Sequence, residues 1–146
     1  MSRLTTFFRG ADTAFGVFFP KHHGLAVFPN FADANGAKAE LHLAGYGVEG
    51  DVIAATGEEV VQFADEHLHK DGLWGLLMTE LSRTIGTEAA YADNDLAAAK
   101  RGEAFVAVRC PTEKARSEAW RVLEPRRPLV ARYYFSGGIE HMAGEI

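Results

Sequence analysis

One order of elements occurs twice in this 146-residue chain, and this repeat restricts the fold more than any other feature of the sequence. Residues 24–55 and residues 103–135 each predict a short apolar strand, a helix with one apolar face and a second strand. Four short strands bury no face by themselves, so the helices that connect them must pack on the sheet. Right-handed crossovers place both connecting helices on the same face.

We therefore predict an α+β fold in which the two β-α-β units form a ferredoxin-like arrangement. An open parallel α/β sheet is the competing architecture, and the short strands and the repeated plan favour the first. The first and third strands should be adjacent and central, which would bury Val27 and Val106 almost completely. The predicted strands are 24–28, 51–55, 103–109 and 129–135, and the connecting helices are 31–44 and about 112–124.

A helical insertion is expected between the two units, at residues 56–102. Thr56 and Glu59 have the spacing of a capping box, which marks the start of a helix. We expect helices from this point to about 70, over 73–85 and over 88–101. The insertion should pack on the rest of the domain rather than act as a free linker. A linker would leave several large apolar side chains exposed to solvent: Val60, Leu68, Trp74, Leu77, Leu81 and Ile85.

The ends of the chain carry weaker patterns than the two units. Residues 1–23 predict an irregular arm with a short strand near Phe15–Phe19, and residues 136–146 predict a short tail released by a pair of glycines. A chain of this length fits one domain, so we expect residues 1–146 to form a single unit.

Charge and cysteine content exclude several classes of protein. The net charge is −5, made up of −8 over residues 1–99 and +3 over residues 100–146, so non-specific binding of nucleic acid is not expected. The single cysteine, Cys110, forms no internal disulfide. No signal-peptide core or transmembrane run is seen, and we expect a cytoplasmic protein without a membrane partner.

Catalytic and metal-binding patterns are sparse. No glycine-x-serine-x-glycine elbow occurs, and Cys110 has no base beside it in the sequence. Glu66 and His69 would share one face of a helix, but a carboxylate-bridged di-iron site needs a second such pair and two further glutamates. We expect neither catalytic residues nor a metal or cofactor.

The strongest candidate site comes from strand alternation, because successive side chains point to opposite faces of a sheet. One face of the last two predicted strands is the one that the connecting helices leave uncovered. Coverage by the insertion helices, self-association, and a pocket for a small anionic or aromatic ligand are three interpretations of this face. The candidate ligand-binding residues on it are Phe105, Arg109, Arg132 and Tyr134, and we expect Ala26 and Phe28 to join them.

Several segments of the chain resemble the bacterial heat-induced general stress proteins. The resemblance is carried by the first strand at 24–28, by Ala44-Gly45-Tyr46 before Asp51-Val52, by the run at 98–108, and by Arg132-Tyr133-Tyr134. It covers about residues 24–135 and departs most at 57–101. The resemblance implies a small stress-associated protein without enzymatic activity.

These observations leave two hypotheses about function. In the first, the chain is a non-enzymatic stress or regulatory protein that acts as a homo-oligomer or through partner binding. In the second, it binds a small molecule, or acts as a minor enzyme, on the uncovered sheet face around Arg109 and Arg132. An extensive apolar two-fold interface would favour the first, and a deep pocket would favour the second.

Overall fold

The computed structural model describes residues 3–8, 13–14, 17–18, 22–46, 51–67, 87–135 and 138–143. Its main feature is a five-stranded sheet in which every neighbouring pair is antiparallel. The fold is therefore α+β, as expected, and not an open parallel sheet. The strand order is β4 (Val52–Ala55), β5 (Ala104–Arg109), β3 (His23–Phe28), β6 (Val130–Phe135) and β7 (Gly138–Ala143).

The centre of the sheet agrees with the sequence prediction. Strands β3 and β5 are adjacent and pair from His23 opposite Arg109 to Phe28 opposite Ala104. Each has a second neighbour, β6 beside β3 and β4 beside β5. Val27 and Val106 are 1% and 0% exposed, so the prediction that both lie in the centre of the core is confirmed.

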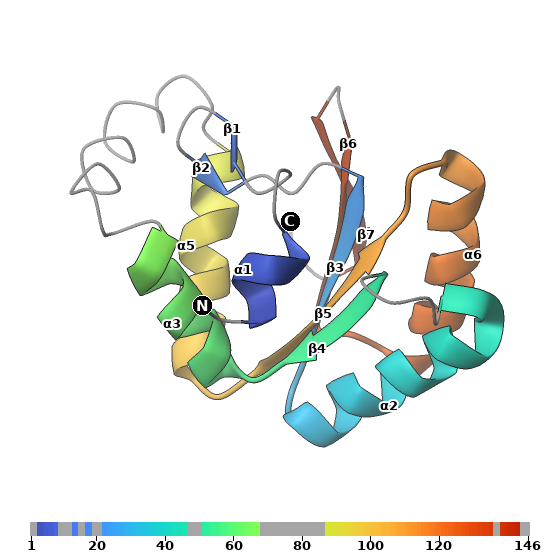
Figure 1. The fold of residues 1–146 in the computed structure, drawn as a ribbon, viewed down its shortest axis with the longest axis horizontal. Coiled ribbons are helices and arrows are strands. Elements are labelled where there is room, and N and C mark those ends of the chain that lie inside the picture. The colour runs from blue at the N-terminus through green and yellow to red at the C-terminus, as the bar shows by residue number, and fades with distance from the viewer. Residues whose placement is uncertain are drawn as a thin grey trace.

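Helices α2 (Phe31–Leu41) and α6 (Glu113–Leu123) cover one face of the sheet (Figure 1). Asn30 caps α2 by accepting a hydrogen bond from the Asp33 backbone N–H at 2.9 Å, which satisfies one of the donors that a helix start leaves free. The helix continues as η1 (His42–Tyr46), and Gly45 has a left-handed φ of 105° that ends it. We call this side the α2/α6 face.

Helices α1 (Arg3–Phe7), α3 (Gly57–His67) and α5 (Thr87–Lys100) lie on the opposite side of the sheet (Figure 1). The predicted capping box is confirmed, because Glu59 N–H donates to Thr56 Oγ1 at 3.1 Å and Thr56 N–H donates to Glu59 Oε1 at 3.0 Å. Side chains of all three helices pack against the strands in two apolar clusters. We call this side the α1/α3/α5 face.

The α1/α3/α5 face is covered, which settles one open question about the predicted insertion. Phe63 of α3 and Ala98 and Ala99 of α5 are buried against the sheet, so the described part of the insertion docks. The predicted helix at 73–85 lies outside the described residues, as do Leu68, Trp74, Leu77, Leu81 and Ile85.

Three predictions about placement are wrong or incomplete. Ala26 and Phe28 lie on the α2/α6 face, because β3 turns its odd-numbered side chains toward α1, α3 and α5. The N-terminal arm contains α1, whose Leu4 is buried and which was not predicted, while the strand expected near Phe15–Phe19 is present as β2 (Val17–Phe18), paired with β1 (Thr13–Ala14). The predicted tail contains β7, which pairs with β6. Ile139 and Met142 give β7 too few apolar side chains to show an alternating pattern in the sequence.

Candidate functional site

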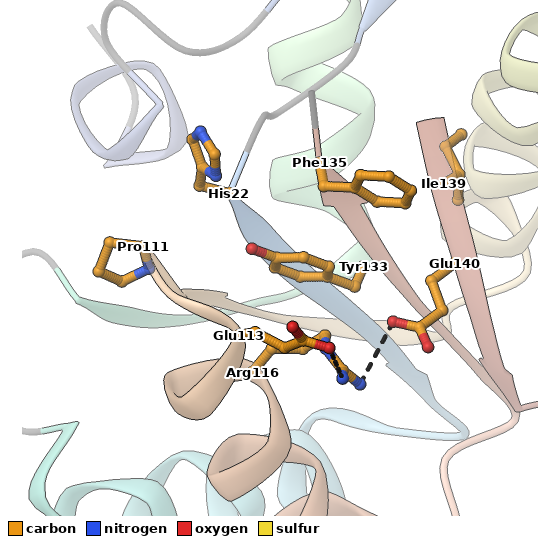
Figure 2. A pocket seen from close by; sticks show the side chains of 8 residues that line it. All are labelled: His22, Pro111, Glu113, Arg116, Tyr133, Phe135, Ile139 and Glu140. Carbon is orange, nitrogen blue, oxygen red and sulfur yellow. Dashed lines mark hydrogen bonds and ion pairs between the residues drawn. The ribbon is translucent and has the colours of Figure 1, made fainter. Parts of the chain in front are cut away.

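A cavity of about 670 Å³ lies where strands β6 and β7 meet the N-terminal end of α6. We call it the β6–β7 groove. Figure 2 shows its lining side chains, with the aromatic rings of β6 along one wall and charged groups of α6 and β7 beside them. The lining residues are His22, Pro111, Glu113, Arg116, Tyr133, Phe135, Ile139 and Glu140.

The aromatic wall of the groove consists of two parallel rings. Tyr133 and Phe135 are two residues apart on β6, so their side chains leave the same face of the strand. Their ring centroids are 6.3 Å apart and the ring planes differ by 9°. Tyr133 is buried and its hydroxyl donates to the Cys110 backbone oxygen at 2.8 Å, whereas Phe135 is 39% exposed. Tyr133 therefore fixes the wall, and Phe135 presents apolar surface to the cavity.

Arg116 lies beside this wall and contacts carboxylates from two elements. Its Nη1 is 3.2 Å from Oε1 of Glu140 on β7, and its Nη2 is 3.4 Å from Oε1 of Glu113 on α6. The guanidinium carbon is 6.0 Å from the centroid of the Tyr133 ring. Thr112 places this turn of α6 by accepting a hydrogen bond from the Ala115 backbone N–H at 3.1 Å.

The exposure of these charged side chains sets the electrostatic character of the groove. The Arg116 side chain is only 17% exposed, whereas those of Glu140 and Glu113 are 46% and 88% exposed. One cation therefore lies inward between two carboxylates that face solvent. The arrangement leaves an excess of one negative charge around Arg116.

The thiol of Cys110 and the phenol of Tyr133 lie buried near the groove and are poor nucleophiles and bases. Burial raises the pKa of Cys110 from 9.0 to about 12, and the Cys110 side chain is 1% exposed. Burial and the nearby Cys110 thiol raise the pKa of Tyr133 as well. Both groups keep their protons at neutral pH, so neither supplies a thiolate or phenolate for covalent chemistry.

Three of the four residues predicted as a ligand site lie beneath helices. Phe105, Arg132 and Tyr134 do share the α1/α3/α5 face, but they are 6%, 1% and 1% exposed beneath the helices. Arg109 is exposed at the end of β5, opposite His23. Of the three interpretations of this face, coverage by helices agrees with the burial.

Arg132 is the buried charge of that face. Its guanidinium forms an ion pair with Asp95 of α5, which is 9% exposed. The guanidinium carbon also lies 5.7 Å from the centroid of the Tyr134 ring. Asp95 could not be predicted as its partner, because no local pattern links an aspartate in an alanine-rich helix to an arginine 37 residues later.

The β6–β7 groove was not predicted from the sequence either. Alternation along the last predicted strand puts Tyr133 and Phe135 on the face of the connecting helices, where Tyr133 is buried but Phe135 is 39% exposed. The turn-type sequence Ser136-Gly137-Gly138, directly after the strand-forming run at 129–135, was the available signal. It indicates a hairpin, and a hairpin would have brought Glu140 next to Tyr133.

Metal-binding side chains do not converge in the described part of the chain, where no group of three or more histidine, cysteine, aspartate or glutamate residues could hold an ion. His69, one member of the pair considered from the sequence, lies outside the described residues. In the same described ranges, none of the helices has the length and apolar character needed to span a bilayer.

Comparison with known proteins adds no relative: no family model, no curated protein and no solved structure matches the chain.

Proposed function

We propose that this protein is a non-enzymatic small-molecule-binding protein whose ligand occupies the β6–β7 groove. The observation that carries the proposal is a cavity of about 670 Å³ whose wall combines the exposed ring of Phe135 with the charged cluster around Arg116. Ligand pockets in proteins have volumes of roughly 300–1,000 Å³ and combine apolar surface with a few placed polar groups. The groove has both properties.

The walls of the groove also support binding without rearrangement. Tyr133 is held by its hydrogen bond to the Cys110 backbone oxygen, and Arg116 is held by contacts to α6 and β7. A ligand that enters such a site loses less free energy to ordering of the protein. The high pKa of Cys110 supports a binding role over nucleophilic catalysis.

The proposal replaces the sheet face first considered for ligand binding or self-association. Helices α1, α3 and α5 cover that face, so neither role can use it as an open surface. A role in stress response and a cytoplasmic location stay predictions from the sequence.

We also propose that the core of the fold is ferredoxin-like, with β7 added to one edge. The support is the strand order, in which the second, third, first and fourth strands of the two β-α-β units follow one another as β4, β5, β3 and β6. Packing of both connecting helices on one face is consistent with the same arrangement.

The proposed function is tested with indole, a flat neutral probe, followed by amide chemical shifts in two-dimensional NMR spectra. Indole should shift resonances of Arg116, Phe135 and Glu140. Phe135→Ala should abolish these shifts, whereas Phe31→Ala should not. Phe31 is a matched control, because it is also 39% exposed but begins α2 and does not line the groove. Equal shifts in both variants, or none in the parent protein, would contradict the proposal.

A further inference from the structure

We infer that the ligand of the β6–β7 groove is an aromatic cation, a flat ring joined by a short arm to an ammonium group. The inference rests on the proposed function and adds the chemical class of the ligand. It follows from two features that meet at one position of the sheet, the row of aromatic rings on β6 and the excess negative charge around Arg116 (Figure 2).

The aromatic half of the ligand is indicated by Phe135. Its ring continues the row that begins with Tyr133, and 39% of the residue is exposed although it is large and apolar. Aromatic rings favour offset-stacked or edge-to-face partners, and a ligand ring at this place would add one more member to the row. Ile139 of β7 also lines the cavity, and its side chain packs against the apolar cluster of the α1/α3/α5 face, so Phe135 is the apolar side chain that the ligand ring would contact.

The sign of the ligand charge is indicated by the balance around Arg116. An anionic group would have to displace Glu113 or Glu140 from the guanidinium, or lie beside two carboxylates of its own sign. A cationic group meets the opposite situation, because the two carboxylates share one arginine. An added ammonium brings the cluster to neutrality and needs no existing contact to break.

The length of the arm is indicated by the strand register. Glu140 lies directly opposite Tyr133 in the ladder between β6 and β7, and Phe135 is two residues further along β6. Directly opposite side chains have Cβ atoms about 4.5–5.5 Å apart, and diagonal neighbours are about 7–8 Å apart. A ring on Phe135 and an ammonium at Glu140 are therefore separated by a short arm, of which two carbon atoms are a suitable length. His22 lies away from Glu140 across the cavity (Figure 2).

The test uses three compounds that share an indole ring and a short arm but differ in charge: tryptamine, indole-3-propionate and tryptophol. Calorimetry gives their affinities, and NMR shifts of Phe135 and Glu140 confirm the place of binding. Tryptamine should bind about tenfold more tightly than indole-3-propionate, with tryptophol between them, because a partly exposed charge pair at contact distance is worth about this much.

Two variants separate charge from structure. Glu140→Gln keeps the shape of the groove and removes the excess charge, so the preference for tryptamine should fall to about twofold or less. Glu124→Gln is the control, because Glu124 is exposed at the far end of α6 and does not line the groove. The preference of the Glu124→Gln variant for tryptamine over indole-3-propionate should stay unchanged.

The outcomes distinguish the inference from the function on which it rests. If all three compounds bind equally in the groove, or indole-3-propionate binds best, the inference is wrong and the ligand-binding function stands. If none of them shifts a groove residue at millimolar concentration, both are wrong. Tighter binding of tryptamine that Glu140→Gln leaves unchanged would also overturn the inference, because the preference would then come from elsewhere.

Discussion

The two faces of the sheet are built by the same alternation of side chains but have different interiors. The α2/α6 face is packed with apolar side chains and alanines, together with a thiol and two phenols. The α1/α3/α5 face contains the buried Arg132, Asp95 and His23. A charged group in the core needs a partner, because removing it from water costs free energy that only an ion pair or hydrogen bonds can offset. The second face therefore depends on specific pairs, whereas the first depends on packing.

The largest expected effect is on the buried ion pair. Asp95→Asn keeps the size of the side chain but removes the negative charge of Asp95 from the buried Arg132 guanidinium, and we expect the free energy of unfolding to fall by about 3–5 kcal/mol. Urea denaturation followed by circular dichroism measures this value.

The control for this prediction is the partly exposed pair of Arg101 and Glu103, whose nitrogen and oxygen are 3.0 Å apart and whose side chains are 61% and 19% exposed. Glu103→Gln should cost less than about 1 kcal/mol, because solvent screens the pair. Similar losses for Asp95→Asn and Glu103→Gln would show that burial does not make the Arg132–Asp95 pair more important for stability than a solvent-screened pair.

The next effect concerns how closely α3 and α5 pack on the α1/α3/α5 face. A Cβ atom at Gly57 would overlap the backbone oxygen of Ala99 and lie 2.9 Å from that of Glu103. Backbone atoms cannot move aside as a side chain does, so Gly57→Ala should lower stability by about 1–3 kcal/mol. The melting midpoint measures the loss.

Gly36→Ala in α2 is the matched control on the α2/α6 face. The three atoms nearest to its Cβ atom would all belong to the end of the Arg126 side chain, the closest at 2.6 Å, and that side chain can shift. Alanine also has the higher helix propensity. We expect an unchanged or slightly higher melting midpoint, and a loss as large as that of Gly57→Ala would contradict the role given to backbone contact.

The difference between the faces also explains what the sequence could predict. The periods of the strands and helices indicated the two β-α-β units, the central position of Val27 and Val106, and the capping box of Thr56 and Glu59. These features depend on residues close together in the chain or on simple alternation. Arg132 was correctly assigned to the face opposite the connecting helices. Its charge was taken to indicate that this face is exposed, because its partner Asp95 comes from a distant helix.

The groove was also less predictable than the core, because its residues are far apart in the chain. Its residues come from the start of α6, from β6 and from β7, and β7 itself was taken for a tail. Arg116 has no local pattern that distinguishes it from an ordinary exposed helix residue. Only the hairpin pairing brings Glu140 to it, so the charge cluster could not be inferred from spacing along the chain.

A smaller loss of stability, of similar size on the two faces, is expected when either central valine is replaced. Val27 points toward the α1/α3/α5 face and Val106 toward the α2/α6 face, and both are almost fully buried. Replacement of either by alanine should cost on the order of 1–2 kcal/mol, through lost methyl groups and incomplete collapse. Urea midpoints of the two variants provide the test. An unchanged midpoint for Val106→Ala would contradict its central position.

The smallest effect is expected at alkaline pH and comes from the α2/α6 face. Burial holds the pKa of Cys110 at about 12 in the folded protein, against 9.0 for an ordinary thiol. The folded state therefore binds this proton more tightly than the unfolded state. The resulting stability is fully present below about pH 9 and is lost as the pH rises toward 12. Between pH 9 and pH 10 the loss should be about 1 kcal/mol.

Cys110→Ala tests this origin, because it removes the thiol from a site where the sulfur lies 3.7 Å from the Val108 backbone oxygen. The variant should be less stable at neutral pH but should lose stability more slowly between pH 9 and pH 10. Tyr46, whose pKa burial raises from 10.0 to about 12, accounts for a further decline at higher pH that the variant keeps. Urea denaturation at half-unit pH intervals gives both slopes. Equal slopes for the parent and variant below pH 10 would show that the thiol is not the group that senses alkali, and that the α2/α6 face does not owe its pH response to this buried residue.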